Sequence, residues 1–234
     1  MNIFRSVWVE RKVILDEVNP KIHRNFESRG WLPLLDVEHP PPAAEHPPSA
    51  ALIREFYSNL SIHSDDSNIH YVKNWIRDEE FVITREVVAS ALDVPLVQQP
   101  VYPYIEFPPI DYIMSLLTST TISSGTNPRI TTHELTELNY LFFRISCHSI
   151  WPISHIHTIP IERCAFLYTL ITNVLISFHT LFIRSLVEVN RSSAKSHGLF
   201  FSIFIHWILL DLGLEYFPAS IGRQRAPIGR QRAT

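Results

Sequence analysis

The chain has 234 residues, of which 46% are hydrophobic and 18% are charged, so it can bury a substantial core. This composition excludes a disordered chain, in which low hydrophobicity and high charge prevent folding. The net charge is −3, and the basic excess that repeated contacts with phosphate require is missing.

Neither the first residues nor the cysteines indicate secretion. Met1 to Glu17 carry several charges without an apolar core of about 7–15 residues, so we expect no signal peptide. The two cysteines, Cys147 and Cys164, are too few for a disulfide framework. We therefore expect an intracellular protein of the cytoplasm or nucleus, with a membrane location as the alternative.

The N-terminal part predicts short helices separated by a proline-rich loop. Asn19, Pro20 and Gly30 have the spacing of an N-cap, a first helical residue and a residue just past a helix end. Residues 39–48 contain five prolines and predict an exposed, extended loop, which is compatible with a proline motif for a partner. Residues 52–60 repeat apolar side chains on one helical face.

The middle of the chain predicts short extended segments and an irregular connector. Residues 69–83 contain two short extended pieces separated by charged residues. Thr84 has the position of a cap for a helix through Leu92. Five prolines in 93–110 predict an irregular connector that can divide two lobes, and a brief helix over 110–117 follows it.

The C-terminal part, over 135–214, carries most of the predicted helical core. Thr131 and Glu134 form a capping box in front of a helix that Pro152 ends. A helix over about 199–212 is apolar nearly all round, which predicts burial on most of its sides. The sequence therefore predicts a mainly α, bundle-like single domain with a few extended segments.

The longest apolar stretch, residues 164–183, allows two interpretations. It contains no charged residue and is long enough to cross a bilayer. Polar side chains such as Thr169, Asn173 and His179 dilute it, and the next apolar segment is too short to return. We therefore expect one buried helix that Pro160 opens, with a transmembrane span as the alternative.

The candidate sites for metal, nucleophilic and nucleotide chemistry fail on spacing. Cys147, His155, His157 and Cys164 are the candidates for zinc, but their intervals are too long for ligands that converge on tight turns. The six glycines form no G-x-S-x-G, no G-x-G-x-x-G and no P-loop sequence. We therefore expect no catalytic residues, no cofactor and no metal, and a protein that is not an enzyme.

Several short blocks follow one another in the order of a known family pattern. They include an arginine-glycine-tryptophan turn, a helix with a Phe-Tyr pair and a tryptophan-proline step. The order of several blocks is more specific than any one of them. The blocks are Glu10-Arg11, Ser28-Arg29-Gly30-Trp31, Leu52–Leu60, Leu135-Thr136-Glu137, Trp151-Pro152-Ile153-Ser154-His155, Arg163–Tyr168, Gly198–Ser202 and Leu212-Gly213-Leu214.

Together these blocks resemble the plant transposon protein domain, over about residues 10–216. The resemblance implies an open reading frame derived from a plant transposable element, close to the retrotransposon polyproteins. It brings no catalytic residues with it. It places the expected domain at 10–217, between an N-terminal extension over 1–9 and a C-terminal tail over 218–234.

The tail over 218–234 contains two nearly identical heptads, IGRQRAP and IGRQRAT. Two units are too few for a repeat fold, and their four arginines have no apolar partners, so we expect a disordered tail. The charged WIRDEE segment and this duplicated tail both depart from the family pattern. The duplication suggests a truncated or decayed copy of the element.

These observations predict a non-enzymatic, helical interaction or assembly module encoded by an element-derived gene. Its expected partner is another protein or a second copy of the chain. The alternatives are an element protein associated with nucleic acid, which would bind with a steep dependence on salt, and a membrane protein with a span at 164–183.

Overall fold

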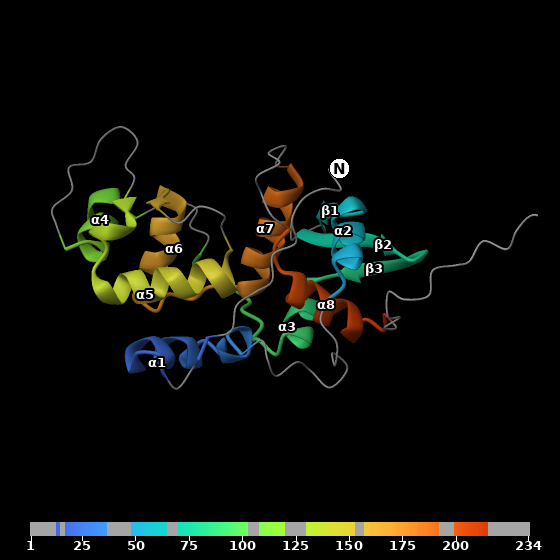
Figure 1. Cartoon of the computed structure of the whole chain (residues 1–234), viewed down its shortest axis with the longest axis horizontal. Coiled ribbons are helices and arrows are strands. Elements are labelled where there is room, and N and C mark those ends of the chain that lie inside the picture. Colours follow the sequence, from blue (N-terminus) through green and yellow to red (C-terminus); the bar gives the residue numbers. More distant parts are fainter. Residues whose placement is uncertain are drawn as a thin grey trace, which may run out of the picture.

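The computed structural model describes residues 13–14, 17–36, 48–64, 70–102, 108–119, 130–152, 157–191 and 199–214. Of these residues 56% are helical, in eight α-helices and shorter helical turns, and a small antiparallel sheet accompanies them. The prediction of a mainly helical fold is confirmed. The molecule is not a pure bundle, however, because the sheet occupies one end of it (Figure 1).

Some predictions fall on segments outside the described residues. These segments are residues 39–47 of the proline-rich loop, the tail over 218–234, and the candidate zinc ligand His155. The domain bounds at 10 and 217 stay predictions, as does the division into two lobes at 93–110.

The first helix, α1 (Pro20–Ser28), begins and ends as its sequence predicts. Asn19 Oδ1 accepts a hydrogen bond from the N–H of Lys21 at 2.9 Å, and Pro20 is the first helical residue. Gly30 follows the helix with a φ of 64°, a conformation that favours glycine. A short 3-10 turn, η2 (Leu32–Leu34), then leads the chain into the core.

Helix α2 (Ala50–Ser58) lies against a three-stranded antiparallel sheet, which has the order β1 (Ser61–Ser64), β2 (His70–Ile76), β3 (Glu79–Ile83). The prediction of two extended pieces is confirmed, but strand β1 was not expected. The link between β2 and β3 is shorter than predicted, because Arg77 and Asp78 alone form the turn, with φ of 52° and 67°. Glu79 and Glu80 therefore belong to a strand.

Helix α4 (Ile110–Leu117) has the bounds that the sequence predicts, and α3 (Arg85–Ala91) ends one residue before the predicted Leu92. Thr84 Oγ1 accepts a hydrogen bond from the N–H of Val87 at 3.4 Å, which confirms Thr84 as the cap of α3. Between these helices Tyr102 forms an isolated parallel bridge with Ile176.

The capping box at Thr131 and Glu134 is present, but it heads a short turn instead of the long helix. It closes the 3-10 turn η3 (Thr132–Glu134), which follows β4 (Ile130–Thr131). Helix α5 (Glu137–Ile145) starts later, where Thr136 Oγ1 accepts from the N–H of Asn139 at 3.3 Å. A π-helical turn, η4 (Ser146–Ile150), continues α5 to Trp151, and β5 (Thr158–Ile159) pairs with β4.

The expectation of one helix over 164–183 is wrong. The stretch forms the end of α6 (Ile161–Ile171) and the start of α7 (Phe178–Arg191). The break falls at Asn173, whose φ of 54° ends the first helix, and Ser177 caps the second. In the described part of the chain, no helix is both long enough and apolar enough to cross a membrane.

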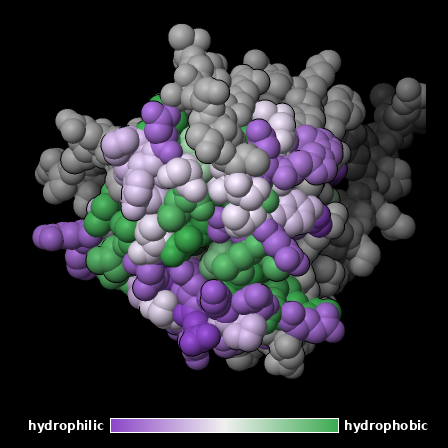
Figure 2. All heavy atoms as spheres, turned by 90° about the vertical axis from the view of Figure 1, so that its left-hand side faces the viewer, coloured by the Kyte–Doolittle hydropathy of each residue, from purple (hydrophilic) through white to green (hydrophobic). Residues whose placement is uncertain are grey.

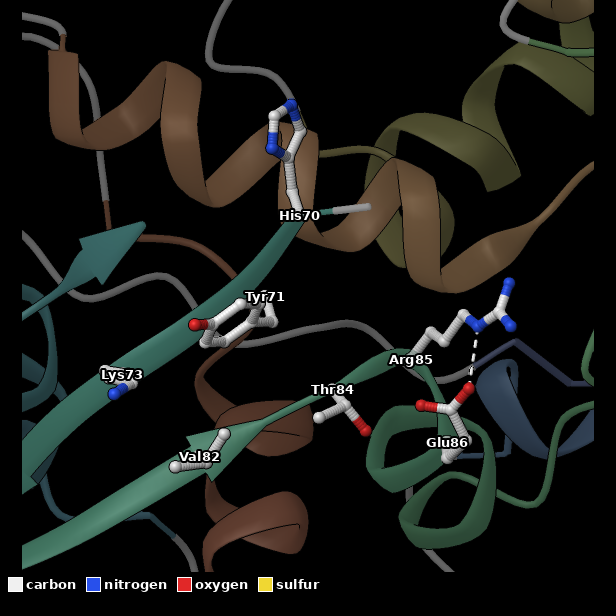
Figure 3. A pocket seen from close by; sticks show the side chains of 7 residues that line it. All are labelled: His70, Tyr71, Lys73, Val82, Thr84, Arg85 and Glu86. Atoms are coloured by element: carbon white, nitrogen blue, oxygen red, sulfur yellow. Dashed lines mark hydrogen bonds and ion pairs between the residues drawn. The ribbon is translucent and has the colours of Figure 1, made fainter. Parts of the chain in front are cut away.

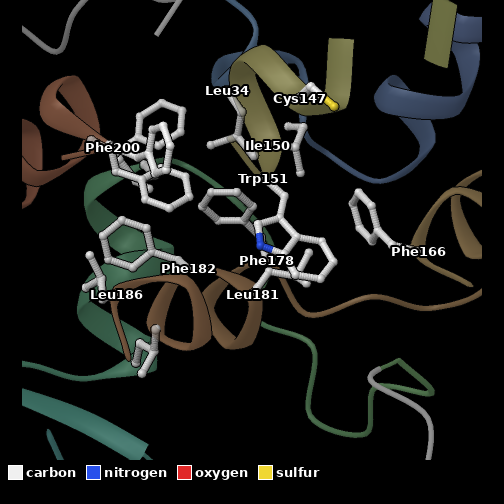
Figure 4. Packing of buried hydrophobic residues seen from close by; sticks show 14 of the residues in the cluster. Leu34, Cys147, Ile150, Trp151, Phe166, Phe178, Leu181, Phe182, Leu186 and Phe200 are labelled. Carbon is white, nitrogen blue, oxygen red and sulfur yellow. The ribbon is translucent and has the colours of Figure 1, made fainter. Parts of the chain in front are cut away.

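Helix α8 (Ser202–Asp211) is buried on nearly all sides, as its sequence predicts. The core nevertheless draws on both halves of the chain, because residues of α1, α2 and the sheet join it. Phe178 lies near its centre, with ring centroids 5.9 Å from Trp31 and 5.9 Å from Phe204 (Figure 4). Residues 135–214 nevertheless supply more than half of the buried core of the described residues, as predicted.

The elements form an elongated molecule (Figure 1). Helices α4, α5 and α6 pack together at one end, and the sheet lies with α2, α3 and α8 at the other. Helix α7 stands between the two ends and contacts both α3 and β2. The outward side chains Trp75 and Val82 stay exposed, so no helix among the described elements covers this side of the sheet.

Candidate functional site

The arginine of the arginine-glycine-tryptophan turn holds the end of helix α6. Arg29 donates from Nη1 to the carbonyl of Val174 at 2.7 Å, and from Nη2 to those of Thr169 at 3.0 Å and Leu170 at 3.2 Å. Asn25 Nδ2 donates to the Leu170 carbonyl as well, at 2.7 Å. The carbonyls of Thr169 and Leu170 lie in the last turn of α6, at its negative end, where they also accept hydrogen bonds from the N–H groups of Val174 and Asn173. Burial lowers the pKa of Arg29 to about 10, so it is still charged at neutral pH.

The next two residues of this turn fix the same junction. A Cβ on Gly30 would lie 2.6 Å from Pro95 Cγ, so the close approach and the positive φ both require glycine. Trp31 is buried, and its ring meets Phe178 edge to face at 5.9 Å. The turn thus connects α1 to both α6 and α7.

The Phe-Tyr pair of α2 connects two other distant segments. Tyr57 donates from its hydroxyl to the carbonyl of Phe200 at 2.9 Å. Asn74 of strand β2 donates from Nδ2 to the carbonyl of Phe56 at 2.8 Å. Helix α2 is thereby held between the inward side of the sheet and the approach to α8.

Trp151 and Arg163 form a stacked pair between η4 and α6. The guanidinium carbon of Arg163 lies 3.4 Å from the Trp151 ring centroid, and its Nη1 donates to the Trp151 carbonyl at 2.6 Å. The Trp151 and Phe166 rings meet nearly at right angles, with their centroids 5.3 Å apart (Figure 4). Burial lowers the pKa of Arg163 to about 10, and this arginine also stays charged at neutral pH.

The described candidate zinc ligands, Cys147, His157 and Cys164, are not brought together as a ligand group. Within the ranges that the structure covers, no three His, Cys, Asp or Glu side chains are placed to hold a metal ion. Cys147 and Cys164 are buried, and burial raises the pKa of each thiol to about 12. Both are therefore protonated at neutral pH, whereas metal binding and nucleophilic attack need the thiolate. His157 lies exposed beside strand β5.

A serine-histidine pair that the sequence did not reveal lies at the start of α7. His179 Nε2 is 2.7 Å from Ser177 Oγ, a spacing that nucleophilic catalysis also uses. Ser177 is 0% exposed and His179 is 4% exposed, so no substrate reaches them. Ser177 also accepts a hydrogen bond from the N–H of Thr180 at 3.1 Å, which makes it the cap of α7.

The buried His179 makes the stability of the protein sensitive to acid. Desolvation, with a smaller effect of the charge on Arg85, lowers the pKa of His179 to about 4. As the pH falls, His179 therefore takes up a proton at about pH 6.5 in the unfolded chain but only at about pH 4 in the folded chain. The free energy of unfolding is expected to fall between these values, by about 2 kcal/mol at pH 5.

Urea unfolding of the wild type and of His179→Gln, from pH 7.5 to 4.5, checks this expectation. Glutamine does not titrate and can still bond to Ser177, so the difference between the two curves isolates the histidine. A difference that does not change with pH would show that His179 binds a proton equally readily in the folded and the unfolded protein.

The outward surface of the sheet carries exposed aromatic and aliphatic side chains. Trp75 is 53% exposed and Val82 is 39% exposed, although neighbouring side chains on the inward side are buried. The His63 ring stacks on Tyr71 at 5.5 Å, one strand away. We call this surface the sheet face. It consists of the outward side chains Ser61, His63, Tyr71, Lys73, Trp75, Glu80 and Val82.

A hollow of about 450 Å³ opens where the sheet face meets the start of α3 (Figure 3). Tyr71, Lys73 and Val82 line it on the strands. Arg85 lines its other side and pairs with Glu86 at 2.7 Å. The hollow is thus an extension of the sheet face with an aromatic, an aliphatic and a cationic wall.

A second exposed apolar area lies at the opposite end of the molecule, on α4 and α5. Its members Leu116 and Leu141 are 38% and 39% exposed. Polar side chains divide the apolar ones on this face (Figure 2). Its aromatic member, Tyr112, is 54% exposed and meets the ring of Tyr168 at 5.9 Å.

The alternation in IHYVKNWI contained the signal for the sheet face. The sequence predicted extended chain here, and period-two alternation then places Tyr71, Lys73 and Trp75 on one side. Which side is buried depends on α2 and α7, which pack on the strand from the other side. Local pattern alone could not decide between the two sides.

By its fold, the chain is a mainly helical protein with a small antiparallel sheet. Residues 27–214 match the family model described as "Putative plant retrotransposon-related domain", which covers most of the chain. The chain belongs to this plant retrotransposon-related family, which confirms the resemblance to a plant transposon domain. No curated protein and no solved structure matches the chain.

Proposed function

We propose that this transposon-derived protein is a non-enzymatic interaction module that binds its partner through the sheet face. The exposure of Trp75 carries the proposal. Tryptophan and tyrosine are enriched in the centres of protein interfaces, where they supply much of the binding energy. Trp75, Tyr71 and Val82 form one outward surface beside a hollow, which gives a partner both a flat and a concave area.

The uses of the family blocks support a non-enzymatic role. Arg29, Tyr57 and Trp151 hold distant segments together and are not free to act on a substrate. The nucleophilic side chains Cys147 and Cys164 are buried and protonated. Action inside the cell, in the cytoplasm or nucleus, belongs to the proposal, because both cysteines are free thiols, as a reducing compartment keeps them.

Site-specific photo-crosslinking in plant cells tests this function. A photoreactive phenylalanine analogue at position 75 is expected to give discrete adducts. The same group in place of Leu175, which is 59% exposed and lies on another surface, is the matched control and is expected to give none. Equal adduct patterns at both positions, or none at position 75, would reject the sheet face as the binding surface.

A further inference from the structure

We infer that the sheet face binds an extended, proline-rich segment, and that the occupant is residues 39–48 of a second copy of this chain. The inference rests on the proposed function and adds the chemistry of the partner. Proline-rich chain adopts the polyproline II conformation at little entropic cost and docks on grooves lined by aromatic side chains. Residues 39–48 contain five prolines, in one cluster of three and one of two.

The spacing of the aromatic residues fits the spacing of the proline clusters. Tyr71 and Trp75 lie on the same side of β2, four residues apart, so their Cα atoms are separated by about 13 Å. Pro42 and Pro47 end and begin the two clusters, and five polyproline II residues span about 16 Å. Each aromatic side chain can therefore meet one proline cluster.

The charges of the two surfaces also correspond. Lys73 lies between Tyr71 and Trp75 on the strand, and Glu45 lies between the two proline clusters. Lys73 lines the hollow, where it can meet a carboxylate without leaving the sheet face. An ion pair in this position would set the register of the bound segment.

The same charges favour a peptide over nucleic acid. Glu80 lies directly across from Trp75, and Glu86 neutralises Arg85 at the edge of the hollow. A strand of phosphates would need an excess of positive charge, which these residues do not provide. A proline-rich segment with a single carboxylate needs only Lys73.

The position of α2 favours a second copy over the same molecule. The proline-rich segment continues through Pro48 into α2. Helix α2 packs on the inward side of the sheet, where Asn74 donates to the Phe56 carbonyl. The sheet therefore separates the end of the segment from the sheet face of its own molecule. Docking between copies would make the chain self-associate, as an assembly module does.

Titration of a synthetic peptide of residues 37–49 into the full chain, followed by Trp fluorescence and calorimetry, tests the inference. We expect binding in the micromolar range, which Trp75→Ser weakens at least tenfold and the matched Leu175→Ser leaves unchanged. A peptide with all five prolines replaced by alanine should also bind at least tenfold more weakly. Failure of the wild-type peptide to bind, or equal binding to Trp75→Ser, would overturn the inference.

A charge exchange tests the register independently. Lys73→Glu should weaken the wild-type peptide at least fivefold, and a peptide with Glu45→Lys should restore binding to that variant. Unchanged circular dichroism and melting temperature verify that the variants fold. Loss without restoration would reject the pair of Lys73 and Glu45.

Light scattering over a range of concentrations tests the source of the segment. The wild type should self-associate. Two variants should be monomeric: Trp75→Ser, and the full chain with the five prolines of residues 39–48 replaced by alanine. A wild type that is monomeric at every concentration would reject the second copy as the occupant.

Tight binding of a fifteen-nucleotide oligothymidylate that Glu80→Gln strengthens would identify nucleic acid as the partner instead. Crosslinks from position 75 to another protein, without peptide binding, would keep the proposed function and reject the inference.

Discussion

Replacement of Arg29 by alanine is expected to lower the free energy of unfolding by about 3–4 kcal/mol. The change removes three charge-assisted hydrogen bonds, to the carbonyls of Thr169, Leu170 and Val174. A hydrogen bond to a charged group contributes about 1.5–3 kcal/mol, and bonds that share one donor group are not additive. Urea unfolding measures the loss, and hydrogen exchange should be accelerated most between α6 and α7.

Two variants bracket this result. Arg29→Lys keeps the charge but has no planar fork, so it should restore about half of the loss. Arg24→Ala, in the same helix, removes an exposed bond to the Pro20 carbonyl and should change stability by less than about 0.5 kcal/mol. If Arg29→Ala behaves like Arg24→Ala, the arginine does not hold the end of α6.

Trp151→Ala is expected to destabilise the protein by about 3–5 kcal/mol, the range for loss of a large buried aromatic side chain. Trp151 is 3% exposed, packs on Phe166 and supports the Arg163 guanidinium. Alanine would leave a cavity and a partly buried charge that has lost its stacking partner. Thermal and urea unfolding measure the effect.

Trp151→Phe separates the ring from the indole nitrogen. Among the described residues none accepts a hydrogen bond from Trp151 Nε1, so phenylalanine should lose only volume and some of the cation–π attraction. We expect a loss of about 1–2 kcal/mol. Equal losses for the two variants would contradict the stacking of Arg163 on an aromatic ring as a source of stability.

The elements that the sequence predicted best are those with local signals. Asn19 with Pro20, and Thr84, each bond to an N–H within three residues, so the chain around them contains the whole cause of the helix start. The box at Thr131 and Glu134 is equally local, and it formed. The prediction was wrong only in placing the long helix directly after this box, because Thr136 caps that helix instead.

The features that the sequence could not reveal depend on distant partners. The stretch 164–183 contains no charged residue, and its break at Asn173 is held by Arg29, far away in the sequence. The pair of Ser177 and His179 could not be predicted either, because it lies at the start of the second helix, which exists only because of that break. The sheet face required knowledge of which side of β2 meets α2 and α7. The period-two pattern of a strand predicts which side chains lie on the same side, but not which side other elements cover.

The contact between Arg29 and the end of α6 also constrains how the protein is made. Arg29 meets the carbonyl of Thr169, which lies 140 residues later in the chain. At a synthesis rate of about 5–20 residues per second, the ribosome needs roughly 7–28 s to supply that partner. The first helix must wait on the ribosome for most of the protein to be translated. A copy of the element with a stop codon before residue 169 would therefore produce a chain in which Arg29 lacks its bond to the Thr169 carbonyl, and its first helix cannot pack against the end of α6.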